Sequence, residues 1–242
     1  MSVLTNQVAV VTGASSGIGR AIALDLAQQG VNLALVGRNL ERLEAVAAIA
    51  QKSAPKVITY SIDLTVGEKI PKLKTNLLQD FGQINLLVHS AGAFSMGLVQ
   101  DTSVEKLDWL YQTNVRAPYL LTQSLLSTIV SSQGQIVFIN SSVIERARAN
   151  VIQYAATKHA LKAMADSLRE EVNAKQVRIL SIYLGRTATP TQAMIHQMEA
   201  KPYHPENLIQ PEDVASVVTN ALSLPRSTEV TDIKLRPFAK PI

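Results

Sequence analysis

The chain has 242 residues, of which 47% are hydrophobic and 17% are charged, and its net charge is +4. This composition predicts a folded globular protein rather than a disordered one, and the absence of cysteine excludes disulfides, zinc–thiolate sites and thiol nucleophiles. Lysine and arginine are scattered, and no apolar run approaches roughly 18 residues, so we expect no nucleic-acid partner and no membrane span. A polar segment at 1–7 leads directly into the first strand, which leaves no room for a signal peptide. The absence of cysteine fits a reducing, cytoplasmic setting.

Short runs of apolar and β-branched residues alternate with longer amphipathic stretches. The first pattern is typical of strands and the second of helices. In chain order we predict a strand at 8–11, a helix at 18–29, a strand at 32–36, a helix at 40–52, a strand at 56–60, a helix ending near 81, a strand at 84–89, a helical region at 104–131, a strand at 135–139, a helix at 151–173, a strand at 177–183, a helix beginning at 211–214 and a strand near 229–235.

The predicted strands are almost continuously apolar, which indicates burial on both faces and a parallel sheet between two layers of helices. We therefore predict an α/β fold, a doubly wound parallel sheet of about seven strands with helices on both faces. No linker or repeat interrupts it, so one domain is expected over residues 1–242. Residues 185–210 form the only long irregular segment, and such segments often cover a ligand, so this is the candidate substrate lid.

Three glycines separate the first predicted strand from the first helix, in the segment Thr12-Gly13-Ala14-Ser15-Ser16-Gly17-Ile18-Gly19. Gly13 permits a tight turn, Gly17 lets the backbone approach a pyrophosphate, and Gly19 lets the helix lie close to the sheet. The unpaired N–H groups of the helix N-terminus then face the anion. A glycine-rich turn without a ligand is the alternative, but the position between strand and helix favours dinucleotide binding.

The end of the second strand indicates which dinucleotide binds. NAD-binding proteins place an acidic residue there, about 20 residues beyond the glycines, to bind the ribose hydroxyls. Here the strand ends Leu35-Val36-Gly37-Arg38-Asn39, without a carboxylate. Arg38 offers a charge-assisted partner for the 2′-phosphate of NADP(H). A solvated arginine at the start of a helix is the alternative, and its place directly after Gly37 favours the phosphate role.

A tyrosine and a lysine lie four residues apart on the helix after the fifth strand, in Tyr154-Ala155-Ala156-Thr157-Lys158. This spacing puts both side chains on one helix face. A nearby ammonium group favours the phenolate and lowers the tyrosine pKa, which suits proton transfer. Ser141 and Ser142 end the preceding strand, and we expect one hydroxyl to hold a carbonyl oxygen in the same cleft. For the tyrosine and lysine alone, an ordinary amphipathic helix surface is the alternative.

Together these motifs resemble those of the short-chain dehydrogenase/reductase family over nearly the whole chain. The matching segments are 12–19, Asp63-Leu64, Ala91-Gly92, Asn114, Ser141, Tyr154 with Lys158, and 211–215. The resemblance implies a Rossmann-type fold and an NADP(H)-dependent oxidoreductase that interconverts a ketone or aldehyde and an alcohol by hydride transfer.

The resemblance also implies roles for individual residues. Tyr154 would be the general acid/base, Lys158 would bind the nicotinamide ribose and lower the tyrosine pKa, and Ser141 would polarise the substrate carbonyl. Ser141 is preferred to Ser142 because it lies 13 residues before Tyr154, as in typical members. Asn114 would hold a water of a proton relay through Lys158, and Asp63 would accept from the adenine amino group. The cofactor-contacting set would be Gly13, Ser15, Ser16, Gly17, Ile18, Gly19, Arg38, Asp63, Leu64, Ala91, Gly92, Tyr154, Lys158, Gly185, Thr187 and Thr189, with no metal site.

Two positions depart from the family's pattern. His89-Ser90-Ala91-Gly92 follows the fourth strand where members have Asn-Asn-Ala-Gly, and we interpret His89 as part of the scaffold. Leu184-Gly185 stands where Pro-Gly is usual, so we expect a looser turn around the nicotinamide.

The sequence leaves the substrate open. Apolar candidate walls such as Phe94 and Met96 predict a partly hydrophobic small molecule; Arg146 and Arg148 either recognise an acidic substrate or lie in a solvated loop. An NAD-dependent alcohol dehydrogenase on the same scaffold and a non-catalytic NADP(H)-binding sensor are the alternative functions. The long helices at 104–131 and 151–173 resemble those of the family's dimer interface, so a homodimer or homotetramer is expected.

Overall fold

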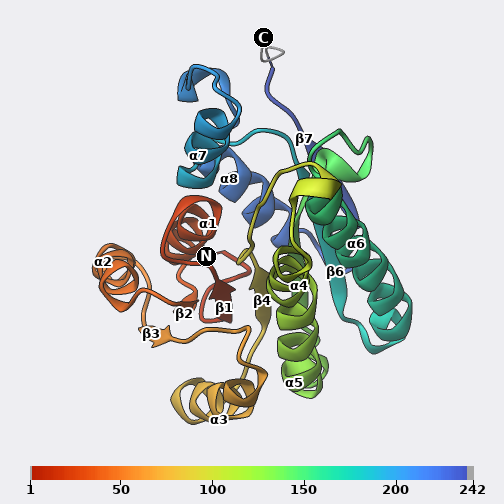
Figure 1. The fold of residues 1–242 in the computed structure, drawn as a ribbon. Helices are drawn as coiled ribbons and strands as arrows, with labels where there is room; N and C mark the ends of the chain where they lie inside the picture. The colour runs from red at the N-terminus through yellow and green to blue at the C-terminus, as the bar shows by residue number, and fades with distance from the viewer. Residues whose placement is uncertain (1, 239–242) are drawn as a thin grey trace.

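Seven parallel strands lie at the centre of the computed structural model, which describes residues 2–238 (Figure 1). They are β1 (Val8–Thr12), β2 (Asn32–Gly37), β3 (Val57–Ser61), β4 (Leu86–His89), β5 (Gln135–Ser141), β6 (Arg178–Leu184) and β7 (Asp232–Leu235). Their order is β3-β2-β1-β4-β5-β6-β7, and every neighbouring pair is parallel. The predicted doubly wound, Rossmann-type sheet is confirmed. Of the predicted domain range, residue 1 and residues 239–242 lie outside the described residues.

Alternate residues of the strands β1 to β6 supply two apolar cores, one on each face of the sheet. In β1, Ala9 and Val11 belong to one core and Val8 and Val10 to the other, as the two-residue period of a strand requires. All five residues of β1 are buried. Because neither face of the strand meets water, the sequence shows a continuous apolar run instead of an alternation.

Helices cover both faces of the sheet (Figure 1). One core packs against α1 (Gly17–Gln28), α2 (Leu40–Ala50) and α8 (Pro211–Leu222), and the other against α3 (Ile70–Phe81), α5 (Ala117–Ser131) and α6 (Ile152–Val172). Among residues 2–238, no helix has both the length and the apolar character needed to cross a membrane.

The predicted helical region at 104–131 is almost continuous. It consists of α4 (Val104–Tyr111), a five-residue π-helical turn at Gln112–Arg116, and α5. Such turns are often found at functional sites because the widened backbone redirects side chains. Here the turn contains Asn114, whose Oδ1 accepts a hydrogen bond from the Ala93 N–H at 2.7 Å.

The segment 185–210 is not irregular throughout, which corrects the prediction. It contains α7 (Pro190–Met198), which Thr189 begins by accepting a hydrogen bond from the Gln192 N–H at 3.1 Å, with proline at the first helical position. The buried side chains of α7 are Gln192 and His196. Because the inward side chains of α7 are polar, the sequence lacks the buried apolar positions by which the other helices were recognised.

Asn85 joins three strands at the amino-terminal edge of the sheet. Its Oδ1 accepts from the Val8 N–H at 2.9 Å, its own N–H donates to the Val8 carbonyl, and its carbonyl accepts from the Gln135 N–H at 2.8 Å. Val8 is 3% exposed, so its N–H has little access to water once Oδ1 is removed. Asn85 lies at the edge away from the cleft described below and belongs to the scaffold.

We expect Asn85→Ala to lower the free energy of unfolding by about 1–3 kcal/mol, because a buried N–H loses its acceptor. Urea denaturation followed by circular dichroism measures the change. Asn220→Ala, at an exposed position of α8, is the control and should change stability by less than about 0.5 kcal/mol. Equal losses in the two variants would contradict this role for Asn85.

Candidate active site

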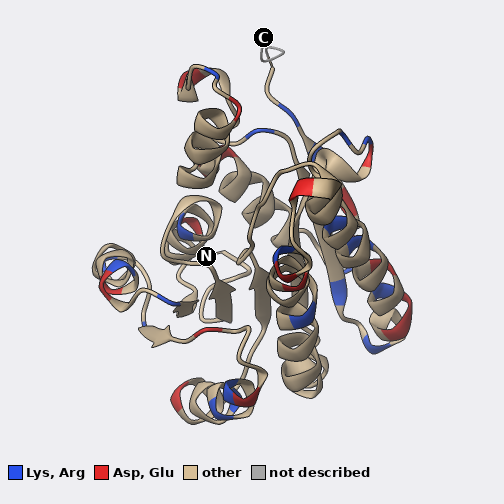
Figure 2. Ribbon diagram, in the orientation of Figure 1, with Lys and Arg blue, Asp and Glu red and all other residues tan. Residues whose placement is uncertain are grey.

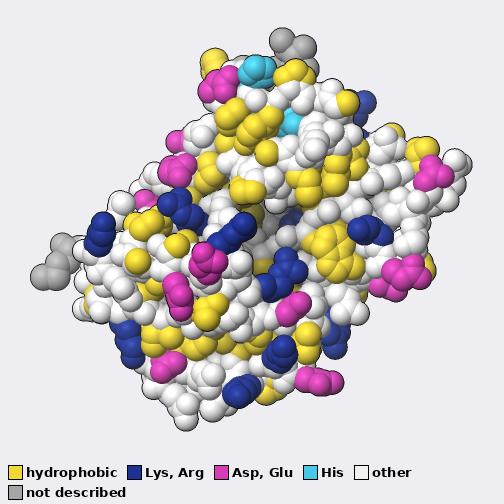
Figure 3. Space-filling model, turned by 60° about the vertical axis from the view of Figure 1, so that its left-hand side comes forward, with side chains coloured by type: hydrophobic (Ala, Val, Ile, Leu, Met, Phe, Trp, Pro, Cys, Tyr) yellow, Lys and Arg dark blue, Asp and Glu magenta, His cyan; other side chains and the backbone are white. Residues whose placement is uncertain are grey.

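A cleft of about 1050 Å³ lies over the carboxyl ends of the central strands, which is where ligands bind in open α/β sheets. Its walls come from the ends of β1, β2, β4, β5 and β6, the start of α6, and α7. Figure 3 shows a hollow in the surface with Lys, Arg and apolar side chains beside it. All the predicted cofactor-contacting and catalytic residues except Asn114 line this cleft.

The glycine turn is packed directly against the segment after β4. Gly13 has φ +66°, and a Cβ there would lie 2.8 Å from the Ala91 nitrogen. A Cβ at Gly19 would lie 2.5 Å from the Gly13 carbonyl oxygen. No side chain fits at either position, so these glycines are required by close backbone approach as well as by the turn.

Thr12 fixes this contact, and it is a residue to which the sequence assigned no role. Its hydroxyl accepts hydrogen bonds from the N–H groups of Ser90 and Ala91, both at 3.1 Å, and donates to the Val88 carbonyl. The side chain is 1% exposed. A strand-end threonine has no distinctive spacing, so only the tertiary arrangement reveals this function.

The N-terminus of α1 opens into the cleft without a capping side chain. Ser16 stands at the N-cap position but makes no side-chain cap hydrogen bond, and the first turn contains no acidic residue. Unpaired N–H groups at a helix start attract anions. Ser15, Ser16, Gly17 and Ile18 all line the cleft, so the turn can hold a pyrophosphate, as the sequence predicts.

Two oppositely charged side chains lie at the far end of the cleft, beyond the glycine turn. Arg38 follows β2 and Asp63 follows β3, with Leu64 beside it. Burial raises the pKa of Asp63, but hydrogen bonds from Thr65 and the Arg38 charge outweigh it and bring the pKa below its usual value. Asp63 is therefore a carboxylate at neutral pH and can accept hydrogen bonds.

Ser141, Tyr154 and Lys158 meet at the middle of the cleft. Ser141 ends β5, while Tyr154 and Lys158 occupy successive turns at the start of α6. The Lys158 Nζ donates to the Ile139 carbonyl at 3.1 Å and lies 5.9 Å from the centre of the Tyr154 ring. The ring of Phe94 packs edge-on against that of Tyr154, with 4.9 Å between centroids.

Burial is the largest influence on the protonation of Tyr154 and Lys158. Burial raises the pKa of Tyr154, and hydrogen bonding with the Ser141 hydroxyl opposes this without reversing it. Burial lowers the pKa of Lys158 to about 8, so its ammonium form still predominates at pH 7. The ammonium of Lys158 is hydrogen-bonded to the Ile139 carbonyl, and its lowering of the tyrosine pKa stays a prediction.

Asn114 is buried beneath the cleft rather than in its wall. Besides accepting from Ala93, its amide donates to the Ala93 carbonyl at 3.0 Å and to the Thr157 hydroxyl at 3.1 Å. Both amide hydrogens are therefore used in joining the loop after β4 to α6. A relay water bound at Asn114 would therefore have to donate a hydrogen bond to the Oδ1 or to the main-chain carbonyl of this residue.

The two departures from the family's pattern have structural partners. His89 stacks on Phe138, with its Nε2 2.8 Å from the Thr122 hydroxyl. Burial lowers the pKa of His89 to about 3, so it is neutral, which agrees with a scaffold role. At the Leu184-Gly185 turn, the Gly185 N–H donates to the Leu235 carbonyl at 2.8 Å, and this bond to β7 restrains the turn despite the missing proline.

The lid segment is anchored by a partly buried polar cluster. Arg186 donates to both oxygens of Glu199, at 2.8 and 2.6 Å, and lies 3.2 Å from the His196 Nε2. The other ring nitrogen of His196 lies 2.9 Å from the Gln192 carbonyl. Thr187 donates to the Gly185 carbonyl, and the methyl of Thr189 lies over Gly17. These contacts place α7 over the glycine turn.

Comparison with known proteins agrees with this geometry. Residues 7–200 match the family described as short chain dehydrogenase. An uncharacterized oxidoreductase of Staphylococcus epidermidis is 34% identical over 239 residues, which is 98% of this chain and 100% of the relative.

Solved structures of oxidoreductases share the fold. An alcohol dehydrogenase from the archaeon Thermococcus sibiricus, complexed with 5-hydroxy-NADP, has a TM-score of 0.87 and 28% identity, covering 98% of this chain and 99% of that one. A metagenomic short-chain oxidoreductase in complex with NADP has a TM-score of 0.85 and 28% identity, with the same coverage. The family match, the relative and the parallel sheet agree, and the chain belongs to the short-chain dehydrogenase/reductase family of oxidoreductases.

Proposed function

We propose that the protein is an NADP(H)-dependent oxidoreductase that interconverts a ketone or aldehyde and an alcohol. The observation that carries the proposal is the meeting of Ser141, Tyr154 and Lys158 in the same cleft as the glycine turn. We also propose that residues 1–242 act as one cytoplasmic domain, with the segment 185–210 as substrate lid.

The residues of the cleft fit a dinucleotide. Where Gly13 approaches the Ala91 backbone, the cleft has room for a ligand because Gly13 has no side chain. The N-terminus of α1, which has no capping side chain, begins next to this place. The pyrophosphate would lie there, with Asp63 and Leu64 at the adenine and Ala91, Gly92, Gly185, Thr187 and Thr189 along the rest. When bound, NADPH would supply the hydride for the carbonyl carbon.

The chain's own residues would handle the carbonyl oxygen and its proton. Ser141 donates a hydrogen bond to that oxygen, which polarises the carbonyl. Because burial keeps the Tyr154 phenol protonated, the hydroxyl can donate its proton to the oxygen as the alcohol forms. Lys158, cationic below about pH 8, would turn from Ile139 to the ribose and favour the phenolate that the transfer leaves. Asn114 positions the loop and α6 and would hold the relay water.

Tyr154→Phe should lower kcat by about 10²–10⁴-fold, because the proton donor is lost, and should leave NADPH binding unchanged. Absorbance of NADPH with a carbonyl panel gives the rate, and fluorescence titration gives the affinity. Tyr119→Phe, at an exposed position of α5, is the matched control and should be fully active. Substantial turnover by the Tyr154 variant would refute its role as the acid/base. Tight NADPH binding by the native chain without any turnover would favour the non-catalytic sensor.

The preference for NADP(H) rests on Arg38 and on the absence of a carboxylate after β2. We expect Arg38→Ala to weaken NADPH binding by about 10–100-fold, because charge-assisted hydrogen bonds to the 2′-phosphate are lost, while NADH binding stays constant. Lys52→Ala, beyond the C-terminal end of α2, is the control. Equal use of NADH and NADPH by the native protein would favour the NAD-dependent alternative.

We also propose a homodimer or homotetramer, formed through the helical regions at 104–131 and 151–173, which contain α4, α5 and α6. Val104 and Leu107 on α4 and Ile152 on α6 are exposed apolar side chains. Light scattering should give twice or four times the chain mass. Val104→Glu combined with Ile152→Glu should shift the mass downward, because a charge is buried at the interface. Ile49→Glu, at an exposed apolar position of α2, should not. A monomeric native protein would contradict this proposal.

A further inference from the structure

We infer that the substrate is an anionic carbonyl compound, with a carboxylate or similar group at some distance from its carbonyl. The inference rests on the proposed reductase function and names the class of substrate for the same cleft. It is carried by four cationic side chains that line the cleft and come from segments outside the glycine turn, Arg146, Arg148, Lys201 and Arg236, called the cationic rim below.

The cationic rim is assembled from three separate parts of the chain. Arg146 and Arg148 lie in the loop between β5 and α6, Lys201 follows α7, and Arg236 follows β7. Within residues 2–238, none of these four side chains has an ion-pair partner or donates a hydrogen bond. Cationic side chains without partners on the wall of a cleft favour the binding of an anion there.

The carboxylates at this end already have partners. Glu145 pairs with Lys234 at 2.6 Å, and Glu199 pairs with Arg186 at 2.6 Å. The third carboxylate that lines the cleft, Asp63, lies at the opposite end, close enough to Arg38 for that charge to lower its pKa. The cationic rim is therefore not neutralised by acidic residues of the cleft.

The charges of NADP(H) have candidate partners elsewhere in the cleft. Its pyrophosphate would meet the α1 N-terminus, and its 2′-phosphate would meet Arg38. Arg146 and Arg148 instead follow Ser141, on the loop that leads to Tyr154. They are placed to meet a molecule bound against the catalytic pair.

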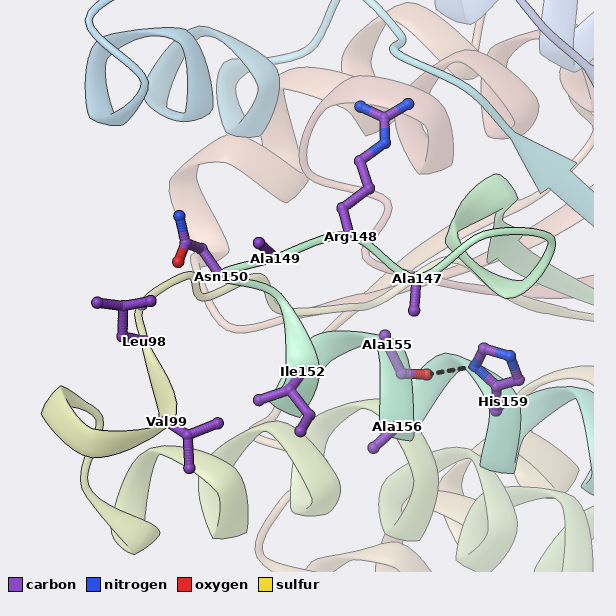
Figure 4. A pocket seen from close by; sticks show the side chains of 11 residues that line it. Leu98, Val99, Ala147, Arg148, Ala149, Asn150, Ile152, Ala155, Ala156 and His159 are labelled. Atoms are coloured by element: carbon purple, nitrogen blue, oxygen red, sulfur yellow. Dashed lines mark hydrogen bonds between the residues drawn. The ribbon is translucent and has the colours of Figure 1, made fainter.

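The direction of Arg148 agrees with this assignment. A second hollow, of about 550 Å³, lies on the outer side of the same loop and is lined largely by apolar side chains such as Val99 and Ile152. Figure 4 shows the Arg148 side chain pointing away from those side chains, to the other side of the loop. Arg148 also lines the large cleft, so its guanidinium belongs there rather than to the apolar hollow.

Apolar side chains line the cleft together with the cationic rim and the catalytic pair. Phe94 packs against Tyr154, and Met96, Val143 and Met194 line the same part of the cleft. An apolar stem would pack against these side chains while the anionic end reaches the cationic rim. This arrangement favours a keto or aldehyde acid over a neutral carbonyl compound.

Keto acids and their methyl esters test the inference, because each pair differs only in charge. The purified chain with saturating NADPH is assayed with 4-oxopentanoate and 6-oxoheptanoate and with the methyl ester of each. We expect kcat/KM for the better acid to exceed that of its ester by about 10-fold or more, because only the carboxylate can form charge-assisted hydrogen bonds with the cationic rim. The preference should fall with added NaCl because exposed charges are screened. Esters reduced as well as the acids would overturn the inference and leave the reductase function intact.

Variants separate the cationic rim from the general charge of the protein. Arg146→Gln combined with Arg148→Gln should abolish most of the preference for the acid by raising its KM, with little effect on the ester. Lys175→Gln combined with Arg226→Gln removes the same charge from exposed positions near the opposite edge of the sheet and should retain the preference. An unchanged preference in the rim variant would contradict the inference.

Binding gives a readout that does not depend on turnover. Trp109 is the only tryptophan of the chain and lines the cleft, so its fluorescence reports occupancy. In protein loaded with NADP⁺, the acids should bind more tightly than the esters, and the rim variant should lose the difference. Equal affinity of acid and ester would overturn the inference. Absence of turnover with every carbonyl compound, despite selective binding of acids, would count against the reductase function alone.

Discussion

The close contact between the β1–α1 turn and the segment after β4 is the constraint on which the rest of the site depends. Gly13 and Ala91 approach so closely that a side chain at Gly13 would not fit. The hydroxyl of Thr12, the residue before Gly13, accepts hydrogen bonds from the N–H groups of Ser90 and Ala91 and so holds the two segments together. The same segment continues to Ala93, which Asn114 joins to the Thr157 hydroxyl on α6. Thr157 in turn donates to the Tyr154 carbonyl at 2.8 Å. An unbroken series of backbone and side-chain contacts therefore sets the distance between the glycine turn and the candidate acid/base.

Burial decides the protonation states in the middle of the cleft. It raises the pKa of Tyr154 and lowers that of Lys158 to about 8, because both charged forms lose solvation. At neutral pH the pair is thus a neutral phenol beside a cation. Reduction of a carbonyl requires a proton donor, and the neutral phenol is one. Oxidation of an alcohol requires the phenolate, which the Lys158 ammonium would favour only after leaving the Ile139 carbonyl.

The sequence predicted the sheet well because strands buried on both faces leave continuous apolar runs, and the β–α alternation fixes the topology. It missed α7 because the inward side chains of that helix are Gln192 and His196, whose burial depends on Arg186 and Glu199 rather than on an apolar core. It brought Tyr154 and Lys158 to one helix face correctly. It could not predict their electrostatic relation, since a spacing of four residues fixes the face but neither the burial nor the Ile139 carbonyl that holds the ammonium. The roles of Thr12 and Thr157 could not be predicted from the sequence either, because their hydrogen bonds join segments that are distant in the chain.

The charge of the chain is concentrated where the chemistry is proposed to occur. Seven lysine or arginine side chains but only three carboxylates line the cleft. The whole chain has 23 basic and 19 acidic residues, and both kinds are spread over helices and loops throughout the fold (Figure 2). An excess of one sign in a concave site focuses the field and raises the local concentration of counter-ions. One cation, Arg186, is committed to Glu199 and holds the lid segment. Arg38 and the cationic rim stand at opposite ends, with Tyr154 and Lys158 between them. This separation suits a reaction between two anionic molecules, NADP(H) and the proposed anionic substrate. Each would bind to cationic side chains at its own end of the cleft, and their reacting groups would meet beside Tyr154 and Lys158.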